Sequence, residues 1–176
     1  MRNVYAVLRA VILCFLLAGC ERPSPEVGSQ PVAKAGSCGL GLPEQTSQEQ
    51  AIWALIGAES TYVVSQETDR LMGLWAVDAQ VSDLKGTPQN PADDQTWKGY
   101  DAIRYRYVRL VFPSAPGAAL PRDLDIRISG DRATITSTTA IGQEVSPAGD
   151  RWEAVQVNDC WLLNRLEYNR EPAGGK

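Results

Sequence analysis

The chain has 176 residues, 44% of them hydrophobic, and carries 17 basic against 21 acidic residues, a formal net charge of −4 at pH 7. This acidic balance, without a basic stripe, argues against a nucleic-acid-binding surface. Histidine is absent. Its absence excludes Ser-His-Asp and Cys-His nucleophilic sites and histidine-ligated zinc. Carboxylate, tyrosine, lysine and arginine remain for chemistry, and we expect neither a metal nor a cofactor.

Residues 1–19 have the composition of a secretory signal. A short basic start, with Arg2 and Arg9, precedes the uncharged apolar run 10–17. This run is well short of the roughly 20 residues that a membrane span needs. Residues 1–19 are therefore excluded from the fold, which leaves 15 basic against 21 acidic residues and a net charge of −6.

The run LLAGC at residues 16–20 resembles the lipobox of a bacterial lipoprotein precursor. The resemblance implies cleavage before Cys20 and acylation of its thiol, palmitate included, which would give stable anchoring to a membrane outside the cytoplasm. An ordinary signal peptide with an incidental cysteine is the alternative. Glu21 stands where an aspartate commonly retains lipoproteins at the inner membrane, so the periplasmic face of the outer membrane is expected.

The other cysteines agree with that compartment. Cys14 would leave with the signal peptide, so Cys38 and Cys160 remain beside the lipidated Cys20. In an oxidising space such an isolated pair predicts a disulfide, since its spacing fits no metal motif. Two free thiols are the alternative.

Residues 20–45 are rich in Pro, Gly and Ser and predict a flexible tether, followed by a domain at 46–169 and a disordered tail at 170–176. Thr46 or Ser47 can cap a first helix, with Glu49 or Gln50 as capping-box partner. Its mostly apolar stripe comprises Ile52, Leu55, Ile56, Glu59, Tyr62 and Val63. A second helix is expected at about 67–75.

A short strand is expected at 79–83, and after a loop Asp101 can cap a third helix that reaches Val111. Arg104, Arg106 and Arg109 are interpreted as its solvated face. Beyond residue 121 the hydrophobic period becomes two, which predicts strands near 124–128, 132–141, 150–157 and 160–169, with turns at 129–131 and 158–159. Helices first and a strand meander last predict an α+β domain with helices covering one face of an antiparallel sheet.

Four segments in this order, at 74–83, 97–107, 128–137 and 150–169, resemble the nuclear transport factor 2-like superfamily, and within it the bacterial SnoaL-like members. The resemblance implies a cone-shaped α+β fold whose curved antiparallel sheet wraps around a pocket, and frequent homodimerisation through that sheet. One function does not follow, because the fold hosts enzymes, binding modules and assembly parts.

The resemblance places Asp83 where ketosteroid-isomerase-like members keep their proton-shuttling base. The position of their oxyanion-donating tyrosine falls on Glu59, and Tyr62 lies about one helical turn later. The dehydratase branch needs a histidine and is excluded. A solvated strand end or a cap is the alternative interpretation of Asp83.

The last strand carries a second polar signal. Strict alternation puts Trp161, Leu163, Arg165 and Glu167 on one face. If that face lines the pocket, Arg165 could orient an anionic ligand. If it is exposed, Arg165 and Glu167 form a surface ladder.

These observations predict a lipid-anchored extracytoplasmic binding or assembly module. It would hold a small, partly apolar or anionic ligand in its pocket, or bind a second copy or an envelope protein. The alternatives are a carboxylate-based isomerase or lyase that uses Asp83, and a structural lipoprotein of an envelope complex. The predicted ligand-binding residues are Tyr62, Trp75, Asp83, Arg165 and Glu167.

Overall fold

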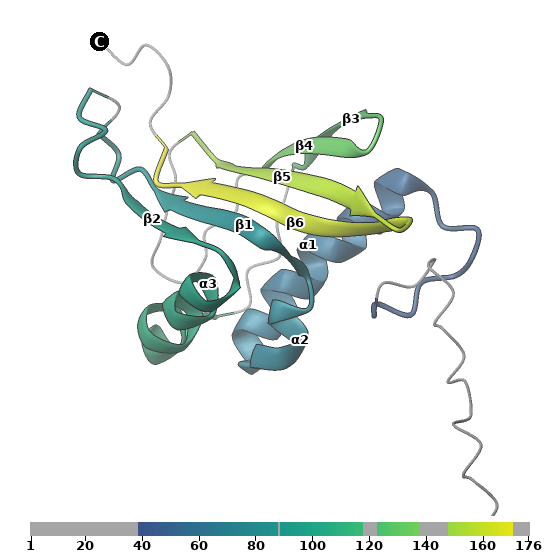
Figure 1. Ribbon diagram of the computed structural model, residues 1–176, viewed down its shortest axis with the longest axis horizontal. Coiled ribbons are helices and arrows are strands. Elements are labelled where there is room, and N and C mark those ends of the chain that lie inside the picture. Colours follow the sequence, from purple (N-terminus) through teal and green to yellow (C-terminus); the bar gives the residue numbers. More distant parts are fainter. Residues whose placement is uncertain (1–38, 88, 118–122, 138–147, 171–176) are drawn as a thin grey trace, which may run out of the picture. The chain divides into compact units, whose positions relative to one another are not determined.

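The computed structural model describes residues 39–87, 89–117, 123–137 and 148–170 (Figure 1). The signal peptide, Cys20, Cys38 and most of the tail lie outside these residues. The described helices are α1 (Gln48–Ser65), α2 (Thr68–Met72) and α3 (Tyr100–Arg106), which continues into the π-helical turn η1 (Tyr107–Val111) and the 3-10 turn η2 (Phe112–Ser114). Among them, none is long and apolar enough to cross a membrane.

The described strands are β1 (Trp75–Asp83), β2 (Gln95–Lys98), β3 (Asp125–Ser129), β4 (Arg132–Ser137), β5 (Asp150–Val157) and β6 (Cys160–Tyr168). They form one curved sheet in the order β2-β1-β6-β5-β4-β3. The helices cover one face of it (Figure 1). The predicted α+β class is therefore confirmed.

The sheet is mixed rather than wholly antiparallel as predicted. β1 runs parallel to β6, while the other neighbouring pairs are antiparallel. No hairpin joins these two strands, which stand first and last in the chain order, so nothing local forces them to be antiparallel. β1 also begins at Trp75 rather than residue 79, which takes Trp75 out of the predicted second helix.

The predicted start of α1 is confirmed. The Ser47 hydroxyl accepts from the Gln50 backbone N–H at 3.2 Å, and the Gln50 side chain accepts from the Ser47 N–H at 3.1 Å. This reciprocal pair satisfies two of the backbone donors that a helix start leaves open. Upstream, Leu40 packs partly buried against the core, although residue 40 was expected in the tether.

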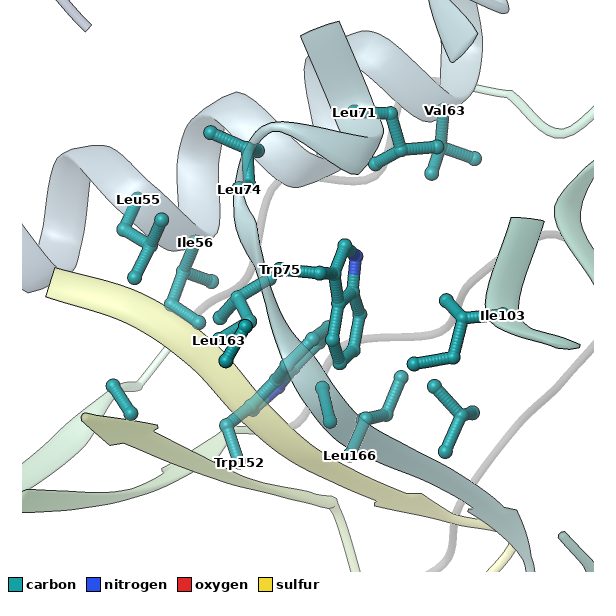
Figure 2. Packing of buried hydrophobic residues seen from close by; sticks show 14 of the residues in the cluster. Leu55, Ile56, Val63, Leu71, Leu74, Trp75, Ile103, Trp152, Leu163 and Leu166 are labelled. Atoms are coloured by element: carbon teal, nitrogen blue, oxygen red, sulfur yellow. The ribbon is translucent and has the colours of Figure 1, made fainter. Parts of the chain in front are cut away.

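The core fills the space between the helices and the sheet (Figure 2). Trp75 stands at its centre, among aliphatic side chains of the helices and of β6, and Trp152 lies beneath it. Both indoles are at most 4% exposed. Burying aliphatic side chains of this kind contributes roughly 1.5 to 3 kcal/mol each. The labelled aliphatic members in Figure 2 are Leu55, Ile56, Val63, Leu71, Leu74, Ile103, Leu163 and Leu166.

A bulge at Asn164 changes which side chains of β6 face the helices. Ala154 of β5 pairs with Leu163 and Glu153 pairs with Arg165, so Asn164 has no residue opposite it. Leu163 and Leu166 are both fully buried in consequence. The strict alternation predicted for this strand is therefore wrong: Leu163 faces the helices, and Arg165 lies on the opposite face.

Candidate functional site

Asp83 ends β1 and is 6% exposed. Its carboxylate forms an ion pair with the Lys85 ammonium, and accepts hydrogen bonds from the Lys85 backbone N–H at 3.0 Å and the Asn169 side-chain amide at 2.8 Å. Burial raises the pKa of Asp83, but the hydrogen bonds from the Lys85 side chain, Asn169 and the Lys85 backbone outweigh it and hold that pKa below the usual value. The carboxylate is therefore a poor proton acceptor at neutral pH.

The helix position aligned with the isomerase tyrosine holds an acceptor instead of a donor. Glu59 is 1% exposed, and its carboxylate accepts a hydrogen bond of 2.7 Å from the hydroxyl of Tyr107. Tyr107 comes from η1 and was not predicted as a site residue. The π-helical turn begins at Tyr107 and follows α3, which ends at Arg106, and both residues are fully buried. A regular helical period in the sequence does not reveal such a turn.

Arg106 contradicts the predicted solvated face of the third helix. Its guanidinium lies over three rings, 4.7 Å from the centroid of Tyr168, 5.2 Å from Trp97 and 5.4 Å from Tyr107. Arg104 and Arg109 are exposed, as predicted. Aromatic faces attract a desolvated guanidinium, which helps this buried cation to be tolerated. Trp97 is 8% exposed and packs in this cluster.

Trp75, predicted as a ligand-binding residue, lies in the interior among other aromatic side chains. Its ring centroid is 6.3 Å from that of Tyr107 and 6.3 Å from that of Trp152. Among the described residues, the indole N–H groups of Trp75 and Trp152 have no hydrogen-bond partner. Trp75 is thus surrounded by the protein's own aromatic side chains, and the indole donors of Trp75 and Trp152 stay unused.

Tyr62 lines a cavity at the surface, apart from Trp75 and Asp83. The cavity has a volume of about 150 Å³ and is lined by Gly39, Tyr62, Arg70, Gly73 and Leu74. It lies where α1, α2 and the segment before α1 meet the start of β1. The Arg70 guanidinium lies 5.5 Å from the centroid of the Tyr62 ring and forms an ion pair of 2.9 Å with Glu67. Arg70 was not predicted, because on a short helix it resembles any exposed arginine.

Arg165 and Glu167 lie on the sheet face that points away from the helices. Arg165 and Glu167 form an ion pair with each other at 3.4 Å. Glu167 also pairs with Arg151 at 3.6 Å, and Arg151 pairs with Glu153 at 2.9 Å. The side chains of Arg165 and Glu167 are 38% and 17% exposed. These ion pairs match the ladder interpretation of Arg165 and Glu167.

No group of three or more potential metal ligands occurs among the described residues. Cys160 opens β6 and is partly buried. Because Cys38 lies outside the described residues, the disulfide between these two cysteines stays a prediction.

Known proteins resemble this chain in structure rather than in sequence. No protein-family model matches the sequence, and no curated protein matches it significantly. Among solved structures, an NTF2-like protein with a cystatin-like fold from Novosphingobium aromaticivorans superposes with a TM-score of 0.57 at 19% identity, over 72% of this chain and 83% of that chain.

Two further structures give similar values. A protein of unknown function with a cystatin-like fold from Nostoc punctiforme has a TM-score of 0.54 at 16% identity, over 72% of this chain and 93% of that chain. A hexachlorocyclohexane dehydrochlorinase, LinA-type3, from Novosphingobium barchaimii has a TM-score of 0.52 at 15% identity, over 68% of this chain and 84% of that chain. Together with the element order, these similarities show that the domain has the nuclear transport factor 2-like, cystatin-like fold.

Proposed function

We propose that this protein is a lipid-anchored extracytoplasmic binding module whose ligand enters the surface cavity beside Tyr62 and Arg70. The observation that carries the proposal is the cavity itself, about 150 Å³ in volume, which combines a cation, an aromatic ring and an apolar side chain. Concave sites with a few convergent polar groups are the usual small-ligand sites of proteins.

The state of Asp83 supports binding over catalysis. A general base works best with a pKa near the working pH, whereas Lys85 and Asn169 hold the pKa of Asp83 below its ordinary value. The dehydrochlorinase among the structural neighbours indicates that enzymes use this fold, but fold alone does not decide function. The isomerase or lyase alternative would need Asp83 to lose these partners.

The lipid anchor is supported by the order of residue types at 1–20 and by the polar segment that follows Cys20. Expression of the full-length chain in a diderm bacterium tests it. We expect the protein in the outer-membrane fraction, with a mass that shows cleavage before residue 20 and acylation. Cys20→Ser should remove the lipid from the mass, whereas Cys14→Ser should leave both mass and fractionation of the mature protein unchanged. Recovery of an unacylated wild-type protein would contradict the anchor.

A pair of glycine variants tests binding in the cavity. Gly39 and Gly41 both have positive φ, +74° and +65°, and a Cβ at either would meet nothing within 4 Å, but only Gly39 lines the cavity. Gly39→Leu and Gly41→Leu therefore impose similar backbone strain, and only the first puts a side chain at the cavity. In a fragment screen of the mature protein by ligand-observed NMR, we expect Gly39→Leu to abolish binding that Gly41→Leu retains. Equal binding by both variants would overturn the proposal.

A second candidate is a ligand in the interior, favoured by the unused indole N–H donors of Trp75 and Trp152. A buried donor without a partner costs about 1 to 3 kcal/mol, which a bound acceptor would offset. Such a ligand would bind equally to both glycine variants, and Trp152→Phe would weaken it. We further propose that the sheet face that points away from the helices, which carries the ion pairs of Arg165 and Glu167, binds a second copy of the chain or an envelope protein.

A further inference from the structure

We propose that the cavity beside Tyr62 binds a carboxylate group, with Arg70 as its ion-pairing partner; this rests on the proposed binding function and names the chemistry of its ligand. Arg70 is the cation among the side chains that line the cavity. A guanidinium presents five N–H donors in a planar fork that matches a carboxylate in two parallel hydrogen bonds.

The surroundings of Arg70 favour this role. One of its terminal nitrogens bonds to Glu67 at 2.9 Å, which leaves other N–H donors of the fork for a ligand. The guanidinium also lies 5.5 Å from the centroid of the Tyr62 ring. This cation–π contact holds the fork at the cavity, so Tyr62 acts as a positioning residue.

Glu67 competes with any incoming anion, but weakly. The side chains of Arg70 and Glu67 are 67% and 40% exposed, and ion pairs exposed to this degree contribute little to stability. Glu67 also accepts a hydrogen bond of 3.1 Å from the Ser65 hydroxyl, so it keeps a partner when a ligand displaces it from Arg70. Arg70 thus resembles an anion-binding residue whose present partner, the Glu67 carboxylate, can be replaced by the carboxylate of a ligand.

The rest of the cavity sets the size of the ligand. Leu74 is 3% exposed and supplies an apolar wall, while Gly39 and Gly73 add no side chains. A cavity of about 150 Å³ holds a benzene-sized group. The fitting ligand is therefore an aromatic or short aliphatic carboxylic acid, either free or as the carboxyl end of a peptide.

Calorimetric titration of the mature protein in detergent with benzoate tests the inference, with benzamide as the neutral isostere. We expect benzoate to bind and benzamide to bind up to about fivefold more weakly, because an ion pair of the 67% exposed Arg70 side chain contributes about 0 to 1 kcal/mol. Arg70→Gln should weaken benzoate by about the same factor, and Glu67→Gln should tighten it by no more than that factor by removing the competitor.

Arg127→Gln is the matched control. Arg127 bonds to Asp125 at 2.8 Å on β3, with a side chain 80% exposed, so this variant removes the same kind of ion pair away from the cavity. It should leave benzoate binding unchanged. Equal affinity for benzoate and benzamide, or an Arg70→Gln variant that binds benzoate like the wild type, would overturn the inference.

Two further arms separate the remaining outcomes. If neutral fragments bind and Gly39→Leu abolishes their binding while benzoate fails, the cavity function stands and the carboxylate inference fails. If Gly39→Leu changes nothing, the cavity function itself fails. A tripeptide ending in phenylalanine, compared with its C-terminal amide, distinguishes a peptide terminus from a free acid: stronger binding than benzoate, lost on amidation, points to a peptide.

Discussion

The surroundings of Asp83 favour its charged carboxylate. The sequence places it at the end of a strand, where the resembling isomerases keep a base. The structure surrounds it with Lys85 and Asn169, which stabilise its charged form. The amide contact from Asn169 ties the end of β1 to the end of β6, while the Lys85 contacts hold the turn that follows β1.

The stability of the protein should therefore depend on Asp83 in acid. Because the folded-state pKa of Asp83 lies below the unfolded value of about 3.8, the stabilisation is present above that value and is lost as the pH falls through the folded pKa. We expect Asp83→Asn to lower the free energy of unfolding at pH 7 by about 1 to 3 kcal/mol, with a smaller difference from wild type near pH 3. Urea denaturation at both pH values measures this.

Asp125→Asn is the control for that measurement. It removes an ion pair with Arg127 in which the Asp125 side chain is 55% exposed, and such pairs contribute about 0 to 1 kcal/mol. A difference between Asp83→Asn and wild type that is as large at pH 3 as at pH 7 would contradict the assigned role.

The buried bond between Tyr107 and Glu59 makes a second prediction for single residues. Tyr107→Phe keeps the ring and removes the hydroxyl that donates to Glu59 at 2.7 Å. We expect a loss of about 1 to 3 kcal/mol of unfolding free energy, since the buried carboxylate of Glu59 loses this hydrogen bond. A double-mutant cycle with Glu59→Leu, which removes the accepting oxygens, measures the coupling between the two side chains. A coupling energy near zero would show that the contact does not stabilise the fold.

Individual elements differ in how far the sequence determines them. The start of α1 could be predicted because its capping box is local, from Ser47 to Gln50. The turn between β5 and β6 could be predicted from Asn158 and Asp159, which both adopt positive φ, +50° and +63°. Features that depend on distant residues could not. The parallel pairing of β1 with β6 and the four-residue β2 carry no local signal.

The candidate site also has one part that could be predicted from the sequence and one part that could not. Tyr62 was predicted for the pocket and does line a cavity, but its neighbours there are Arg70 and Gly39 rather than Trp75 and Asp83. Helical spacing shows which face Tyr62 occupies, yet it does not show which later segment packs beside it. Arg106 was misjudged for a related reason, since its burial depends on rings from β2, η1 and the end of β6.

The bulge in β6 can be tested as an element. Deleting Asn164 would leave Leu163 and Leu166 two positions apart, so regular alternation would keep both on the core face. Deleting Leu162, which has Val155 opposite it, would instead put Trp161 and Leu163 on opposite faces and take one buried side chain out of the core, a loss of about 2 to 5 kcal/mol. We therefore expect the Asn164 deletion to keep cooperative thermal unfolding and the Leu162 deletion to abolish it. Loss of cooperative unfolding in the Asn164 deletion would refute the assignment of Asn164 as the extra residue.

At the scale of the whole molecule, an aromatic core and a surface cavity lie next to each other. In the space between helices and sheet, Trp75 packs against Tyr107 and Trp152. The cavity lies at the edge of this core, where Leu74 also bonds through its carbonyl to the Leu163 N–H of β6 at 2.8 Å. Its remaining wall includes Gly39, near the start of the described chain.

The predicted disulfide would fix that wall. Cys38 directly precedes Gly39 in the sequence, and Cys160 opens β6, so a bridge would close a loop of roughly 120 residues and stabilise the protein by about 4 to 5 kcal/mol in the loop-entropy model. We expect non-reducing mass analysis to show the pair oxidised. Cys38→Ser should lower the melting temperature as much as Cys160→Ser, and the double variant should add nothing further. Because each change would release Gly39, fragment binding should weaken in parallel. Alkylation of both thiols in the unreduced, denatured protein would rule out the bridge.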